Sequence, residues 1–137
     1  MGELHLDLHA DQRFRLAKEM YLKSILQLSK EGTGEVRPVD LVHCLGVTKG
    51  SVSEMLGKLS DDGVIKYKSF KSIQLTSKGR KKADLILRKY HIVRNFLEQI
   101  VGMKHDKSHD EACNLEHAFS DDVVELLEKV VRKKSKK

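Results

Sequence analysis

Three residues near the C-terminal end of the chain could together hold a metal ion. Cys113, Glu116 and His117 are spaced i, i+3 and i+4, so on a helix a thiolate, a carboxylate and an imidazole would share one face. His109 lies one turn earlier and could join that face or support a ligand through a hydrogen bond. The alternative is a set of ordinary structural roles: a core cysteine, a surface glutamate and a hydrogen-bonded histidine. The spacing therefore indicates a metal site in outline.

Nucleophilic catalysis is the competing use of Cys113 and His117. A thiolate beside an imidazole could attack a carbonyl, but the reaction needs an oxyanion hole and usually a sheet that builds a pocket. The sequence indicates neither feature, and it contains no phosphate-binding glycine loop or zinc-hydrolase helix motif. We therefore predict that the protein is not an enzyme and has no small organic substrate.

The elements that must position these residues are mainly helices. The single proline, Pro38, stands at the start of a short apolar segment and leaves the rest of the chain free for long helices. Apolar spacing and capping residues predict helices over residues 11–29, 38–45, 49–61, 77–101, 106–118 and 120–133.

A helix-turn-helix and a hairpin are predicted in the first half of the chain. The helices at 38–45 and 49–61 are joined by Gly46-Val47-Thr48, which is the spacing of a helix-turn-helix. Two β-type runs, 64–68 and 72–75, follow directly and would form the wing of a winged helix. The candidate DNA contacts are Lys49, Ser51, Ser53 and Glu54 on the second helix and Lys66, Lys68 and Lys71 in the wing.

The charge distribution agrees with a nucleic-acid partner for the first half. Residues 64–94 contain 10 Lys and Arg against 1 Asp, whereas residues 95–128 contain 2 against 9 Asp and Glu. Such a division favours a polyanion near the first segment and cations near the second, although solvated helix faces are the simpler explanation of charge alone. No stretch has the length of a membrane span or the pattern of a secretory signal, and two cysteines are too few for a disulfide framework. These features predict a cytoplasmic protein with no membrane partner.

Three separated motifs carry a resemblance to a known family. They are Glu19-Met20-Tyr21-Leu22, Leu75-Thr76-Ser77-Lys78-Gly79, and the run from His109 to His117. In this order and spacing the chain resembles the diphtheria toxin repressor family of metal-dependent regulators, from about residue 12 to residue 130. The resemblance implies a mainly α fold, with a winged helix-turn-helix domain over 1–75 and an all-helical metal-binding and dimerisation domain over 76–137. The length is similar to that of the manganese transport regulators, which lack the SH3-like domain of the longer members.

The same resemblance implies a primary metal site made of Met20, Cys113, Glu116 and His117. Sulfur ligands beside a carboxylate and an imidazole suit Fe²⁺ better than Mn²⁺. The manganese-specific members carry acidic residues where this chain has Met20, Lys23 and Cys113. We therefore expect Fe²⁺ as the activating ion, with Mn²⁺ as the alternative and with Co²⁺, Ni²⁺ or Zn²⁺ able to substitute in vitro.

The family's second metal site matches this chain less well. Its long-helix histidine and acidic residue fall at Tyr90 and Arg94, and only His109 is retained. Tyrosine and arginine are poor cation ligands, so we expect one metal ion per protomer. A rearranged second site using His91 is the alternative.

The sequence, taken together with the resemblance, predicts a homodimeric, metal-activated repressor that binds double-stranded operator DNA. Control of metal-uptake genes is implied by the resemblance alone. A metal ion held by Met20 and by the acidic half would tie the two halves together and favour the DNA-binding arrangement. A winged-helix sensor of an organic ligand, a non-specific DNA-binding protein and a thiol enzyme are the alternatives. Apolar residues are expected at the dimer contact, namely Ile100, Phe119, Val123 and Leu126.

Overall fold

Helices make up most of the structure, a computed structural model that describes the backbone of residues 2–31, 35–67 and 72–135. Side chains are described for residues 13–29, 35–67 and 72–135. The chain divides into two units, Met1–Asp84 and Leu85–Lys137, which we describe separately. Within the described residues, we find no helix with the length and apolar character needed to cross a bilayer.

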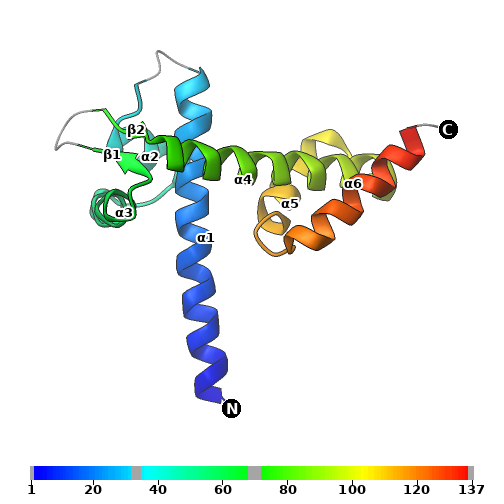
Figure 1. Ribbon diagram of the computed structural model, residues 1–137, viewed down its shortest axis with the longest axis horizontal. Helices are drawn as coiled ribbons and strands as arrows, with labels where there is room; N and C mark the ends of the chain where they lie inside the picture. Colours follow the sequence, from blue (N-terminus) through cyan, green and yellow to red (C-terminus); the bar gives the residue numbers. More distant parts are fainter. Residues whose placement is uncertain (1, 32–34, 68–71, 136–137) are drawn as a thin grey trace. The chain divides into compact units, whose positions relative to one another are not determined.

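The first unit is a winged helix. Its two strands pair antiparallel, with Ile65 opposite Leu75 and Lys66 opposite Gln74. The backbone N–H of Ile73 also donates to the carbonyl of Val36 at 2.7 Å, which ties the segment before the second helix to the wing. Figure 1 shows the strands beside the third helix. The elements are α1 Gly2–Glu31, α2 Pro38–Leu45, α3 Lys49–Asp61, β1 Ile65–Lys66 and β2 Gln74–Leu75.

Local capping residues set the turn between α2 and α3. Pro38 occupies the first turn of α2, and Gly46 closes that helix in the left-handed conformation with φ of 65°. The side chain of Thr48 then accepts the backbone N–H of Ser51 at 3.1 Å and starts α3. The predicted helix-turn-helix is therefore confirmed, with the predicted residues at its turn.

The core of the first unit is apolar and fully enclosed. Leu26, Leu41 and Leu56 come from α1, α2 and α3 and expose none of their surface. Ile73, next to β2, is also buried, so the wing is anchored to the three helices. This packing holds α3 with one face inward and the other in solvent.

The motif that begins at Leu75 fastens the next helix to this unit. The Thr76 hydroxyl donates to the carbonyl of Gly63 at 2.7 Å and accepts the N–H of Gly79 at 3.1 Å. A Cβ atom at Gly79 would lie 1.8 Å from the carbonyl oxygen of Val64. The backbones approach so closely here that only glycine fits.

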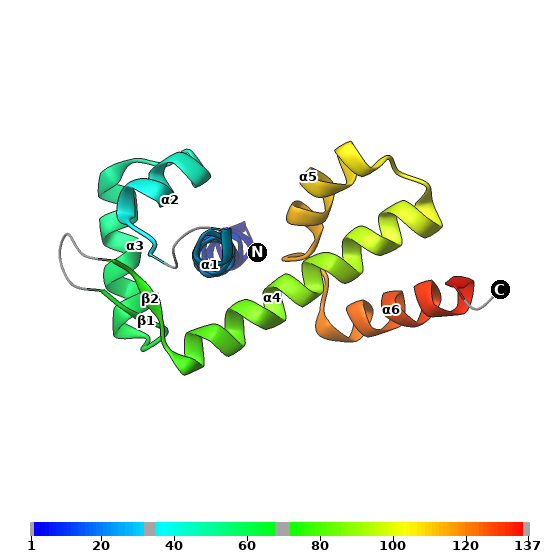
Figure 2. The same cartoon turned by 90° about the horizontal axis from the view of Figure 1, so that it is seen from above.

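The second unit contains the remainder of α4, followed by a π-helical turn and two more helices. α4 spans Ser77–Phe96 and therefore begins in the first unit; it continues into η1, Leu97–Val101, and ends at Gly102 with φ of 84°. α5 spans His105–Leu115 and α6 spans Asp121–Ser135. Within this unit α5 and α6 lie on opposite sides of α4 (Figure 2). The buried core consists of Tyr90, Ile92, Val93, Leu97, Ala112 and Val124.

Several predicted helix boundaries differ from the structure, three of them by more than two residues. The first helix starts at Gly2 instead of residue 11, and the last turn before Gly102 is π-helical. The helix predicted over 106–118 ends at Leu115, so Glu116 and His117 lie in the turn that follows it. Glu116 keeps helical angles, with φ of −56° and ψ of −34°, and the N–H of Ala118 donates to Leu115 at 3.0 Å. Apolar spacing continues across this turn, which is why it was predicted as helix.

Candidate metal centre and nucleic-acid interface

The candidate metal ligands Glu116 and His117 are buried and adjacent. Glu116 exposes none of its surface and His117 exposes 8%. His117 Nε2 lies 3.0 Å from Glu116 Oε1. A carboxyl group this deeply buried requires a nearby polar partner, and the imidazole is adjacent, although its Nε2 does not have hydrogen-bond geometry toward Glu116. Both side chains have the donor atoms that a divalent transition metal prefers.

Cys113 lies against a different histidine. Its sulfur is 3.8 Å from Nε2 of His109, one helical turn earlier on α5. The two cysteines of the chain, Cys44 and Cys113, form no disulfide. Thus the structure brings Cys113 together with His109, and Glu116 together with His117.

The two pairs do not make a single cluster. Among the side chains that the structure describes, no group of three His, Cys, Asp or Glu residues is placed to hold an ion. Glu116 continues the geometry of α5, since its N–H donates to the carbonyl of Ala112 at 2.9 Å, whereas His117 lies in the turn that follows. The donor types fit a soft or borderline divalent cation, and their convergence on one ion stays a prediction.

The two remaining predicted ligands are on other helices. Met20 is on α1 in the first unit and exposes 43% of its surface. His91 is exposed on α4, and its ring packs edge-on against Tyr90 with centroids 5.1 Å apart.

Sequence reasoning noted Tyr90 and Arg94 only as poor ligands, but the structure places them at the centre of a polar network. The Arg94 guanidinium donates to the Tyr90 hydroxyl at 3.0 Å and to the Ser108 hydroxyl at 2.9 Å. It also donates to Glu98 at 3.1 Å and to the carbonyl of His105 at 3.0 Å. Tyr90 and Ser108 are buried, so this network joins α4, η1 and α5 inside the second unit.

The spacing of these residues could have revealed the network. Tyr90, Arg94 and Glu98 follow one another at intervals of four and therefore share one helix face. The network holds Glu98 as a carboxylate. A hydrogen bond from Ser108, assisted by His105 and Arg94, lowers the pKa of Glu98 below its usual value.

The network reaches the candidate metal ligands through Tyr90. The Tyr90 hydroxyl lies within hydrogen-bonding distance of Nδ1 of His109, whose other nitrogen faces Cys113. The two rings are also arranged edge to face, with centroids 5.6 Å apart. The position of His109 is thus fixed from α4.

The predicted DNA-contacting residues of α3 lie on its outer face. Lys49, Ser51, Ser53 and Glu54 are exposed, whereas the inner residues of the helix, such as Val52 and Leu56, are buried. The Ser51 hydroxyl accepts a hydrogen bond from Thr48 at 2.9 Å, which leaves its own proton for a phosphate oxygen. Glu54 lies 3.5 Å from Lys58 one turn later.

The wing is only partly described. Lys66 is exposed on β1, whereas Lys68 and Lys71 lie outside the described residues. The exposed positive charge continues onto the start of α4, at Lys78, Arg80, Lys81 and Lys82. Because cations are unfavourable at a helix N-terminus, this cluster suits a surface that faces an external anion.

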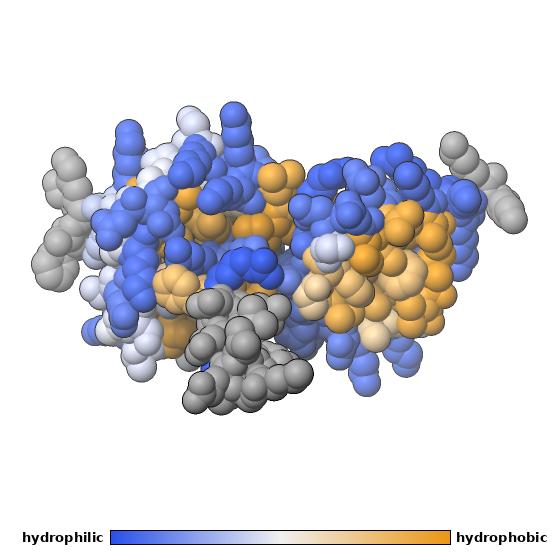
Figure 3. Space-filling model, turned by 60° about the horizontal axis from the view of Figure 1, so that its bottom comes forward, coloured by the Kyte–Doolittle hydropathy of each residue, from blue (hydrophilic) through white to orange (hydrophobic). Residues whose placement is uncertain are grey.

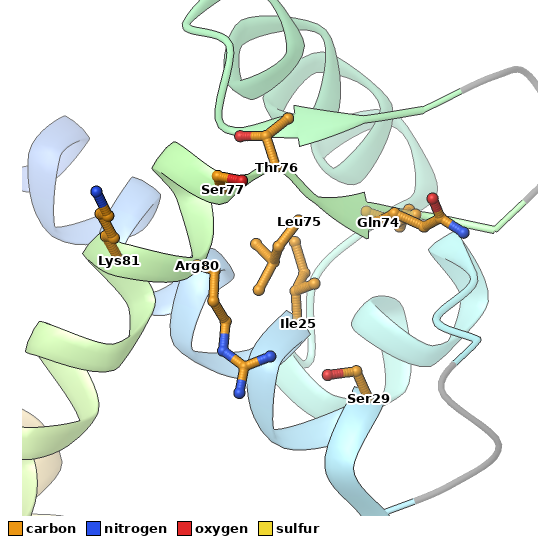
Figure 4. A pocket seen from close by; sticks show the side chains of 9 residues that line it. Ile25, Ser29, Gln74, Leu75, Thr76, Ser77, Arg80 and Lys81 are labelled. Carbon is orange, nitrogen blue, oxygen red and sulfur yellow. The ribbon is translucent and has the colours of Figure 1, made fainter.

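A pocket of about 460 Å³ opens between α1, β2 and the start of α4 (Figure 4). Ile25 and Ile73 form its apolar part, and Ser29, Thr76 and Arg80 supply polar groups. In Figure 4 the amino group of Lys81 points away from the other labelled side chains. Arg80 is also paired with Asp84 at 3.4 Å. This pocket is a place that the organic-ligand alternative could use.

Both halves of the chain match domain families of known repressors. Residues 14–73 match the iron-dependent repressor N-terminal DNA-binding domain, and residues 76–136 match the iron-dependent repressor metal-binding and dimerisation domain. These ranges meet near residue 75, whereas the two compact units divide after Asp84, inside α4. The domain boundary at 75 stays a prediction.

Relatives and solved structures show the same similarity. The chain is 35% identical to the diphtheria toxin repressor of Corynebacterium diphtheriae over 114 residues, which cover 83% of this chain and 50% of that protein. It is 34% identical to an uncharacterised HTH-type transcriptional regulator of Methanocaldococcus jannaschii, over 80% of this chain and 87% of that protein. A manganese-dependent transcriptional repressor in complex with manganese is similar in structure, with a TM-score of 0.78 and 29% identity over 83% of this chain and 52% of the other. The chain thus spans about half the length of the diphtheria toxin repressor that it matches.

A winged helix followed by a helical unit rich in metal-binding side chains defines a class of DNA-binding regulators. Within that class, the chain belongs to the diphtheria toxin repressor family of iron-dependent repressors. The family consists of transcriptional repressors and not of enzymes.

Proposed function

We propose that the protein is a metal-activated transcriptional repressor that binds operator DNA as a homodimer in the cytoplasm. The observation that carries this proposal is the segment at the end of α5. A thiol, a buried carboxylate and a buried imidazole lie there within five consecutive residues, inside the range that matches the metal-binding and dimerisation domain. The exposed outer face of α3 supports the DNA-binding role.

We propose Cys113, Glu116 and His117 as ligands, with the Met20 thioether as the fourth. The two sulfur ligands favour Fe²⁺ over the harder Mn²⁺. A bound divalent ion would supply the positive charge that draws thiolate, carboxylate and imidazole together. Its uptake would release protons, because a thiolate and a neutral imidazole are required.

The residues at the end of α5 can respond to such an ion with a small movement. Glu116 already has helical backbone angles, so extension of α5 by one turn would bring His117 onto the face that Cys113 and Glu116 share. The contact between Glu116 and His117 described above must then change. Binding energy would thus be coupled to a defined conformational change, which is the basis of a population shift.

The DNA-bound arrangement would be the one that metal favours. A preference of a few kcal/mol for that arrangement would raise its population about 100-fold. Serine and lysine contacts from α3 and the wing would hold the phosphates, and Glu54 could accept a hydrogen bond from a cytosine amino group. Much of the sequence specificity would then come from dimer spacing and DNA shape.

An apolar surface on the second unit supports self-association. Val123, Leu126 and Val130 are exposed along one side of α6, and Val101 is exposed on η1. Figure 3 shows hydrophobic side chains gathered over this unit. Of the residues predicted at the dimer contact, Val123 and Leu126 are exposed, whereas Ile100 and Phe119 are partly buried. Exposed apolar side chains concentrated in this way are typical of protein contacts.

The central test is DNA binding as a function of metal. Fluorescence anisotropy with the protein's own promoter DNA should show tight binding with Fe²⁺ under anaerobic conditions and loss of at least about 100-fold in affinity with excess chelator. Cys113→Ala and His117→Ala should bind weakly at all metal concentrations and stay dimeric. Cys44→Ala, which removes the other cysteine, should behave as the unmodified protein. Tight binding in chelator would overturn the proposal.

Mn²⁺ is the second candidate ion, because the structural similarity includes a repressor described as a manganese complex. Competition between Fe²⁺ and Mn²⁺ in the same assay distinguishes the two. Activation by Mn²⁺ at concentrations where Fe²⁺ has no effect would assign the protein to manganese sensing.

A further inference from the structure

Hydrogen-bonding contacts in the second unit lead from Arg94 through Tyr90 and His109 to the sulfur of Cys113. An arginine side chain is always a hydrogen-bond donor, so the oxygen of Tyr90 is the acceptor of the 3.0 Å contact from Arg94. The single hydroxyl proton of Tyr90 is therefore available for Nδ1 of His109.

Donation from the Tyr90 hydroxyl to Nδ1 would set the tautomer of His109. A neutral imidazole carries one proton, and a nitrogen that accepts a hydrogen bond cannot hold it. With Nδ1 accepting from Tyr90, the proton of His109 resides on Nε2. That nitrogen lies 3.8 Å from Sγ of Cys113, within reach of an N–H···S hydrogen bond.

We propose that Arg94 and Tyr90 are positioning residues that hold His109 as a hydrogen-bond donor to the sulfur of Cys113. This inference rests on the proposed function, since it concerns the same metal centre. It assigns His109 a supporting role instead of a place among the ligands. It also gives a role to Tyr90 and Arg94, because a guanidinium ion is a permanent cation that needs no metal to organise its neighbours.

The surroundings of Arg94 make it a rigid anchor. Glu98 supplies the balancing charge at 3.1 Å, and the Ser108 hydroxyl, which is fully buried, contacts both side chains. These contacts fix the guanidinium before any ion binds. A metal ligand whose orientation is fixed by neighbouring hydrogen bonds binds more tightly, and loss of such neighbours typically weakens metal binding about 10- to 100-fold.

Cobalt spectroscopy tests this assignment, with Co²⁺ alone as the probe. The sulfur-to-cobalt charge-transfer band of the Co²⁺-loaded protein reports the hydrogen bonding of the coordinated sulfur. Tyr90→Phe removes only the hydroxyl, and His109→Ala removes the donor. Both should move the band to longer wavelength, because a sulfur atom without an N–H donor holds its electrons less tightly, and both should weaken Co²⁺ binding about tenfold. A purely structural effect would weaken binding and leave the band in place.

Two matched controls are Tyr67→Phe and His43→Ala, which make the same changes in the first unit and should leave the band and the affinity unchanged. If His109→Ala instead alters the visible ligand-field bands as the loss of a ligand does, His109 is a ligand and the inference is wrong. An unchanged band in both Tyr90→Phe and His109→Ala also overturns it. Cys113→Ser tests the proposed ligand set separately from the role of His109. A charge-transfer band that survives this change contradicts the ligand set itself.

A second readout uses the protein without metal. In ¹⁵N-labelled protein above the pKa of histidine, His109 should carry its proton on Nε2, and that proton should exchange slowly with water. Its exchange should become faster in Tyr90→Phe. A proton on Nδ1 of His109 would mean that His109 donates to Tyr90 instead of accepting from it, and this result would exclude the proposal.

Discussion

The turn between α2 and α3 and the turn after α5 differ in how their conformation is specified. At the first, Gly46 and Thr48 fix the backbone through a left-handed residue and a side-chain cap next to each other in the sequence. At the second, the C-cap residue of α5 is Glu116, which has helical backbone angles, and His117 follows it. The DNA-binding element is thus built by local residues, whereas the candidate metal segment can continue the helix or leave it.

The largest expected effect is a loss of stability in the first unit, whose turns are set by local residues. Gly79→Val should destabilise the protein by about 3 kcal/mol, because its side chain would displace the backbone of Val64. Urea unfolding followed by circular dichroism measures the change. Gly57→Ala is the matched control, since a Cβ there meets nothing within 4 Å, and it should stabilise α3 by about 0.5 to 1 kcal/mol. Equal effects of the two changes would contradict the close approach at Gly79.

The metal segment should be the part that changes on ion binding. Hydrogen exchange of the backbone amides at 114–119 should slow at least about tenfold when Co²⁺ is added, as expected for a turn that joins a helix. The hydrogen exchange of the backbone amides at 46–52 should change much less when Co²⁺ is added in the absence of DNA. If both segments slow equally, the contrast between the two turns is wrong.

A cap deletion at the first turn should have an intermediate effect. Thr48→Ala removes the acceptor for the Ser51 N–H and should cost about 1 kcal/mol of stability. Thr48→Ser keeps the hydroxyl and should restore most of the loss. Unfolding midpoints of the three proteins give the comparison, and a full loss in Thr48→Ser would indicate packing of the methyl group instead of capping.

The wing should contribute affinity without sequence preference. Replacing Lys66 by Ala should lower the slope of log affinity against log salt concentration by about one, if this side chain neutralises one phosphate. Operator and random DNA should be weakened almost equally. Loss confined to the operator, with an unchanged slope, would show that the wing reads bases.

The smallest expected effect is the pH dependence of one ion pair. The hydrogen bond from Lys18, at 2.7 Å, lowers the pKa of Asp62 below its ordinary value. The pair therefore stabilises the folded state fully above the pKa that Asp62 has in the unfolded chain, and this contribution disappears as the pH falls through the lower folded value. Urea midpoints of Asp62→Asn and the unmodified protein should differ slightly at pH 7 and converge in acid. Lys18→Met should show the same pH dependence.

The sequence allowed most of the fold to be predicted because its signals are local. Pro38, Gly46 and Thr48 mark the helix-turn-helix, and the alternation of apolar residues marks the wing. The candidate ligands could be named from their types and spacing. Their actual partners could not, because the contact of His109 with Tyr90 depends on the packing of α5 against α4. The end of α5 at Leu115 was also missed, since the apolar pattern does not stop there.

The π-helical turn at the end of α4 has a consequence for comparisons of chain length. One turn of π-helix holds an additional residue relative to an α-helix, and it does so without disturbing the turns on either side. A homologous chain that is one residue shorter between Leu97 and Gly102 can therefore keep both the buried face that contains Val93 and the start of α5. An insertion or deletion of a single residue is tolerated at this point of the helix, whereas elsewhere along it the same event would rotate every later side chain by about 100° around the axis.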